Sequence, residues 1–119
     1  MNPQEGEGFS DYDAELIEII REFRDGLTER LEGLRTALRT LAKGFDPGAA
    51  ESFYRTAHSL KGTAPSFGAH ELVGNATALA ELGFHWQKAG STTADDIAVA
   101  SGELEELQAA VEAYVRRID

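Results

Sequence analysis

Apolar residues at helical spacing are the feature that most limits what this chain of 119 residues can fold into. In four stretches an apolar residue recurs every three or four positions, which places a stripe along one face of a helix. The first stripe comprises Leu16, Ile20, Phe23, Leu27, Leu31, Leu34, Leu38 and Leu41, and the last comprises Ile97, Ala100, Leu104, Leu107, Val111, Tyr114 and Ile118. No stretch alternates apolar and polar residues as a half-buried strand does. The pattern predicts an all-α fold.

Glycine, proline and capping residues separate the first two helices. Gly44 is the predicted stop of the first helix, and Phe45 is expected to fold back onto the core. Asp46 and Pro47 are residue types preferred at the N-cap and at the first helical position, so a second helix is predicted to start there. Its inward residues are Phe53, Ala57, Leu60, Ala64 and Phe67, with Pro65 bending the last turn and Gly68 ending it.

Two further helices complete the predicted fold. The third is expected at about 70–89, and Gly90 ends it. Thr92 or Thr93 is predicted to cap the fourth. The inward candidates of the third helix are Leu72, Ala76, Leu79 and Trp86. Four helices with short connections predict an antiparallel up-down four-helix bundle over residues 11–119. Residues 1–10 are predicted to be a flexible N-terminal tail, with Ser10 or Asp11 capping the first helix.

The charge and the lack of cysteine exclude several classes of function. Eleven basic and twenty-one acidic residues give a net charge of −10, which disfavours nucleic acid and acidic lipid as partners. The dense basic pair, Arg116 and Arg117, is expected to complement a helix C-terminus. Without cysteine there is no disulfide framework and no thiolate metal site. The N-terminus is polar and no apolar run approaches ~18 residues, so we expect a cytoplasmic protein.

The segment AHSLKGTA at 57–64 puts chemically active residues in the middle of the second predicted helix. Gly62 costs about 1 kcal/mol there relative to alanine. At 100° per residue, His58, Lys61, Gly62 and Pro65 lie together on the face opposite the core stripe. The alternative is an ordinary surface histidine beside a tolerated glycine.

The residue types on this face favour phosphoryl transfer. An exposed imidazole is partly neutral near pH 7, so a ring nitrogen of His58 can act as a nucleophile. Lys61 puts a positive charge where a dianionic group on that nitrogen would lie. Gly62 lets the backbone of another protein approach closely. The chain has no glycine-rich phosphate loop and no second domain to hold ATP, so it is not expected to be a kinase or another enzyme.

The segment HSLKGTA at 58–64, followed by Gly68 and Leu72, resembles the histidine phosphotransfer (HPt) signature H-x-L-K-G-x-A-x-x-x-G-x-x-x-L at every fixed position. With the predicted bundle, the resemblance covers nearly the whole chain. It implies a phosphorelay protein whose partners are response-regulator receiver domains and a hybrid or histidine kinase. We expect it to be a monomer.

The resemblance also implies roles for single residues. His58 would accept the phosphoryl group at Nε2 and exchange it with receiver aspartates, Lys61 would neutralise the phosphate, and Gly62 would make room for the receiver. The Mg²⁺ of such reactions belongs to the receiver, so no metal or cofactor is expected on this chain.

One position departs from the family pattern. Family members often have Glu or Gln twenty-two residues after the histidine, where it orients the imidazole, and this chain has Ala80 there. Glu81 points about 100° away and cannot replace it. This departure motivates an alternative, an HPt-like docking module that regulates a kinase or response regulator without carrying phosphate. A third hypothesis is a structural bundle that self-associates through its fourth helix.

The partner surface around His58 is expected to be partly apolar. Its candidates are Pro65, Ile17 and Ile19 of the first helix, and Ala80 of the third; core positions stay open for Ile17 and Ile19. The other histidines, a group of acidic residues and the tryptophan are expected to have structural positions only. His70 and His85 lack the spacing of a metal pair and are expected in solvent. The acidic residues Glu103, Glu105 and Glu106 are also expected in solvent, while Trp86 is expected in the core.

Overall fold

The computed structural model describes residues 11–119, which are helical throughout except at the connections. Its elements are α2 (Asp11–Lys43), α3 (Pro47–Thr63), η1 (Ala64–Phe67), η2 (His70–Leu72), α4 (Val73–Ala89) and α5 (Ala94–Ile118), where η denotes a 3-10 helix. No strand occurs in this part of the chain, so the predicted all-α class is confirmed. The predicted tail at 1–10, including the possible cap Ser10, lies outside the described residues.

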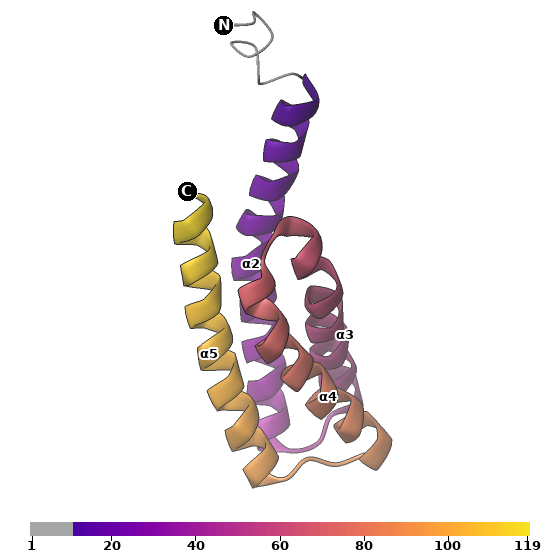
Figure 1. Cartoon of the computed structure of the whole chain (residues 1–119). Helices are drawn as coiled ribbons and strands as arrows, with labels where there is room; N and C mark the ends of the chain where they lie inside the picture. The colour runs from indigo at the N-terminus through magenta and orange to yellow at the C-terminus, as the bar shows by residue number, and fades with distance from the viewer. Residues whose placement is uncertain (1–10) are drawn as a thin grey trace, which may run out of the picture.

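Consecutive long helices run in opposite directions (Figure 1). Helix α2 packs against α3 and α5, and α4 packs against the same two helices, so the contacts form a closed ring. The contact between α3 and α4 is the most extensive of these. This arrangement is consistent with the predicted up-down bundle.

The predicted stripes supply the core. From Phe23 to Leu41 the stripe of α2 is buried, and so are the central residues of the α5 stripe. Trp86 is fully buried, with its ring centroid 5.1 Å from that of Phe53, and its indole Nε1 donates to Asp96 at 3.2 Å. The core position predicted for Trp86 is confirmed, and Phe45 packs against the core as expected.

The first turns of α2 lie outside the core, which corrects the start of the predicted stripe. Leu16 is 45% exposed and Ile20 is half-buried, whereas Phe23 is 5% exposed. The N-terminal end of α2 extends beyond the other helices (Figure 1), so among residues 11–119 no second helix lies beside these turns. Asp11, the other predicted cap, is the first residue of α2 in the described part of the chain, and the capping prediction itself stays untested.

The caps of α3 and α5 and the end of α4 are as predicted. The Asp46 carboxylate accepts from the backbone N–H of Ala49 at 2.9 Å, and the Thr93 hydroxyl accepts from that of Asp96 at 3.0 Å. Gly90 ends α4 with φ of 66°, a left-handed conformation that favours glycine.

The end of the second helix differs from the prediction. α3 ends at Thr63, and residues 64–67 form a 3-10 turn before Gly68, which has φ of 70°. Pro65 lacks the N–H that would continue the α-helical hydrogen bonds, so the chain tightens instead of bending. The third helix likewise starts later, because residues 70–72 form the 3-10 turn η2 before α4 begins at Val73.

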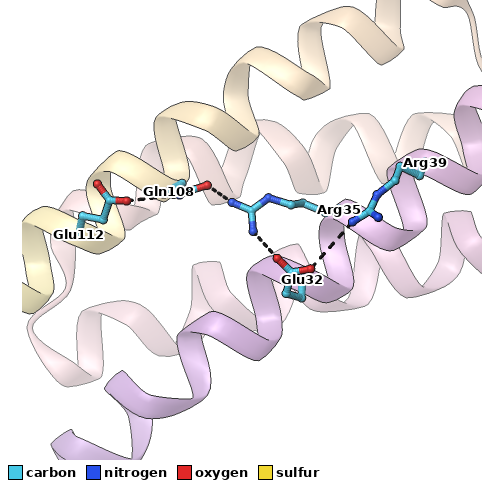
Figure 2. Close-up of polar contacts among 5 residues, drawn as sticks. All are labelled: Glu32, Arg35, Arg39, Gln108 and Glu112. Carbon is cyan, nitrogen blue, oxygen red and sulfur yellow. Dashed lines mark hydrogen bonds and ion pairs between the residues drawn. The ribbon is translucent and has the colours of Figure 1, made fainter.

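A polar seam joins α2 to α5 (Figure 2). Arg35 donates to Glu32 at 2.7 Å and also to Gln108, which donates to Glu112 at 3.3 Å. Arg39 lies 3.9 Å from the other oxygen of Glu32. Exposed ion pairs contribute about 0–1 kcal/mol each to the stability of a fold. This seam therefore contributes mainly to the alignment of α2 with α5.

Candidate functional site

The exposed face of α3 carries the residues that the sequence put together. His58, Lys61, Gly62 and Pro65 are all exposed, whereas Leu60 between them is buried. The exposure predicted for this face is therefore observed. An exposed nucleophile on a rigid helix can be reached by a docked protein without any opening of the bundle.

A ring stack holds the His58 imidazole. The ring of Tyr54, one turn earlier on α3, lies with its centroid 5.3 Å from the imidazole centroid at an interplanar angle of 22°. No side chain among residues 13–119 forms a hydrogen bond with His58. Tyr54 was not predicted as a site residue, although its position four residues before His58 is the signal that could have identified it.

Tyr54 lies at a close approach between α3 and α4. A Cβ atom built on Gly83 of α4 would lie 2.9 Å from the Cα of Tyr54, so only glycine fits at this crossing. The ring of Phe84 lies 6.0 Å from that of Tyr54, and Phe84 is 49% exposed. We call Tyr54, His58 and Phe84 the aromatic row. Lys88 Nζ lies 5.1 Å from the Phe84 centroid and places a cation at the end of this row.

Ala80 does not belong to the partner surface that was predicted around His58. It is 5% exposed and belongs to the core, so its exposed placement was wrong. Ala80 follows Ala76 and Leu79 along α4, the face that packs into the bundle, and sequence periodicity alone did not separate this position from the edge. Glu81, the next residue, is exposed, and no hydrogen bond joins it to the imidazole of His58.

Lys61 and Gly62 are both open to an incoming group. Lys61 forms no ion pair with any described residue, so its ammonium is available to an anion. A Cβ on Gly62 would meet no neighbouring atom within 4 Å. The packing of the bundle does not require glycine at this position.

The connection beyond the site is tied to the end of α5. Tyr114 donates its hydroxyl to the carbonyl of Phe67 at 2.7 Å. Arg117 donates to the carbonyl of Gly68 at 2.6 Å and to Glu71 at 2.8 Å. These bonds fix the turn that follows Pro65. The prediction that Arg117 complements a helix end therefore missed its contacts with Gly68 and with Glu71 of η2.

The Glu71–Arg117 pair predicts a pH-dependent stability. The hydrogen bond from Arg117 holds the pKa of Glu71 below its usual value, and partial burial opposes this. A carboxyl group whose pKa is lower in the folded state than in the unfolded state stabilises the fold at pH values above its unfolded pKa. This stabilisation is lost as the pH falls through the folded pKa. Glu71→Gln should therefore lower the free energy of unfolding by less than about 1 kcal/mol at pH 7. Urea titrations should show this difference shrink below about pH 4; an equal difference at pH 7 and pH 3 would contradict the pairing.

The isoleucines of α2 are not beside His58. Ile19 is 47% exposed, which settles the open question of a core position, and Ile17 is half-buried. Phe23 stacks on Phe67 with centroids 4.4 Å apart, at the far end of the α3–η1 segment from His58. Ile17 lies about 9 Å further along α2. A partner on His58 would have to extend past Phe67 to reach these isoleucines.

The remaining predicted surface residues lie as expected except Glu103. His70 and His85 are exposed, as are Glu105 and Glu106, while Glu103 is half-buried and accepts from Asn75 at 2.8 Å. In the described part of the chain, no group of three or more His, Asp or Glu side chains gathers as metal ligands do. No helix there is both long and apolar enough to cross a membrane.

Comparison with known proteins identifies the class. Residues 18–116 match the family model of the Hpt domain. Because the match covers most of the chain, the chain belongs to the Hpt domain family. Members of this family are phosphotransfer modules of two-component signalling that interact with receiver domains and histidine kinases, and they are phosphocarriers, not kinases. No curated protein and no solved structure was found to match the chain.

Proposed function

We propose that His58 is the phosphoryl-accepting residue and that the protein exchanges the group with receiver-domain aspartates. The observation that carries the proposal is the exposed imidazole next to an unpaired cation, Lys61, and an open position, Gly62, inside the matched region. The inferred partners are receiver domains and a hybrid or histidine kinase. We infer a cytoplasmic monomer that needs no cofactor of its own, with Mg²⁺ supplied by the receiver.

The chemistry follows from the groups on this face. The Nε2 lone pair of His58 attacks the phosphorus of a receiver aspartyl phosphate, and the bond between phosphorus and the carboxylate oxygen breaks. The carboxylate leaves with the electron pair, and the Nδ1 proton passes to water as the ring regains neutrality. Lys61 stabilises the dianionic phosphoryl group on the histidine. Transfer to a second receiver is the reverse of these steps.

Direct mapping of the phosphate tests the proposal. The chain is incubated with a phosphorylated receiver domain of its source organism, and its intact mass is followed. We expect a gain of one phosphate that is lost in acid, as a phosphoramidate bond is, and fragmentation should place it on His58. Phosphate on His70 or His85, or no phosphate from any receiver or kinase of the organism, would overturn the proposal.

Lys61 should affect the rate of transfer but not the fold. Lys61→Ala removes an exposed cation without an ion pair, so stability should change by no more than about 0.5 kcal/mol. Transfer from a phosphorylated receiver should slow by roughly tenfold, as for the loss of one charge-assisted hydrogen bond. Lys61→Arg keeps the charge and serves as the matched control in stopped-flow transfer assays. An unchanged rate in Lys61→Ala would contradict the role.

A docking module that carries no phosphate is the second candidate. It is favoured by Ala80, a core residue that offers the imidazole no hydrogen bond. This candidate requires that receiver binding persist in His58→Gln while no donor phosphorylates the wild-type chain. The third hypothesis, self-association through the fourth helix, is disfavoured because Leu104, Leu107 and Val111 of that stripe are already buried inside the bundle.

A further inference from the structure

We propose that Tyr54 is the positioning residue of the site: its ring orients the His58 imidazole and stabilises the positive charge that the imidazole gains during transfer. This inference rests on the proposed function of His58. Its starting point is the stack itself, with centroids 5.3 Å apart and rings 22° from parallel. Aromatic pairs at such separations attract each other when their rings are offset.

The stack restrains the imidazole without covering its reactive atom. Helical side chains lean toward the preceding turn, so His58 naturally lies over Tyr54. The lone pair of an imidazole nitrogen lies in the plane of the ring, whereas Tyr54 occupies one face of it. The edge of the ring that must reach phosphorus therefore stays open while rotation of the ring is restricted.

The face of the Tyr54 ring also suits the charge that develops. When Nε2 of His58 bonds to phosphorus and before Nδ1 loses its proton, the imidazole ring carries a positive charge. The face of an aromatic ring attracts a cation within about 6 Å of its centroid, and the imidazole lies inside this distance. Within residues 13–119 no carboxylate or amide side chain hydrogen-bonds to His58, so the ring face is the stabilising group that the structure provides.

Tyr54 is itself held in place from α4. The backbone of Tyr54 lies against Gly83, where even a Cβ atom would come within 2.9 Å, and its ring centroid lies 6.0 Å from that of Phe84 on the same helix as Gly83. Tyr54 of α3 is thus packed against α4 through both its backbone and its ring, which restrains the ring on which the imidazole stacks. A helix-surface histidine without such a neighbour would sample several rotamers.

A small phosphoryl donor separates the reactivity of His58 from receiver docking. Phosphoramidate transfers its phosphoryl group to histidine with cleavage of its P–N bond and release of ammonia, and it makes no protein contacts. Tyr54→Leu and Tyr54→Met keep apolar volume but remove the ring face, so labelling should slow by between about twofold and tenfold. Tyr54→Phe should restore it to within about twofold. Val99→Ala changes an exposed apolar residue of α5 outside the aromatic row and is the control, with the wild-type rate expected.

Proton NMR of the unphosphorylated chain supplies a readout that a purely structural role would not move. The ring protons of His58 should be shifted upfield from those of exposed His70, and Tyr54→Leu should remove this shift while Tyr54→Phe keeps it. Wild-type labelling rates in both Tyr54→Leu and Tyr54→Met, or ring signals of His58 that ignore Tyr54→Leu, would overturn the positioning role alone. Label that survives His58→Gln would instead overturn the proposed function, and this role with it.

Discussion

His58→Gln should abolish phosphorylation, from a receiver domain and from phosphoramidate alike. Glutamine keeps a polar group of similar reach, but its amide nitrogen has no basic lone pair to attack phosphorus. The expected effect is a loss of signal to background, because no other residue on this face has an imidazole and the ammonium of Lys61 has no lone pair to attack phosphorus. The measurement is intact mass, with acid lability as the mark of the histidine bond.

His70→Gln and His85→Gln are the matched controls for this result. Both histidines are exposed, as His58 is, and neither lies on its face of α3. Each control should take one phosphate at the wild-type rate. Since His58 is at the surface, its replacement should cost no more than about 1.5 kcal/mol, the upper range for a lost aromatic contact. Circular dichroism can therefore show that the unlabelled variant is folded, and full labelling of His58→Gln would exclude the assignment.

Alanine substitution at two helical glycines changes stability in opposite directions. Gly62→Ala places a methyl group where no atom lies within 4 Å, so the gain in helix propensity remains and the fold becomes up to about 1 kcal/mol more stable. Gly83→Ala gains the same propensity but drives a Cβ to within 2.9 Å of the Tyr54 backbone. Overpacking of this kind costs about 1–3 kcal/mol, and a backbone neighbour cannot rotate away as a side chain can.

Thermal melting distinguishes the two substitutions. Each kcal/mol corresponds to about 4 °C for a domain of this size, so the melting temperatures of the two variants should lie several degrees apart on opposite sides of wild type. Gly74→Ala is the control on α4, because its Cβ would also meet nothing within 4 Å. A Gly83→Ala variant as stable as Gly74→Ala would show that α3 and α4 are not in close contact at Tyr54.

The sequence predicted the helices well because each signal was local. Asp46 and Thr93 cap their helices through their own side chains, and Gly90 supplies a left-handed residue that few others can adopt. The stripe of α5 predicted its buried residues because this helix has neighbours along most of its length. The stripe of α2 failed at Leu16, since periodicity says which face is apolar but not how far the neighbouring helices extend.

The sequence predicted only part of the candidate site, for a related reason. His58, Lys61, Gly62 and Pro65 lie on one helix, so their spacing alone gathers them. Tyr54 was within reach of the same reasoning, but its importance depends on Gly83 and Phe84 of another helix, and no spacing within α3 reports that contact. Ala80 was misplaced because small residues are compatible with either a buried or a bordering position of α4.

The single tryptophan of the chain gives the bundle an internal optical probe. Trp86 is fully buried on α4, touches Phe53 of α3 and donates to Asp96 of α5, so three helices meet around one indole. Its emission reports whether those helices are assembled, and a group attached to the outward imidazole of His58 does not touch it. Folding and phosphoryl loading of the same sample can thus be followed by separate signals, without any added label.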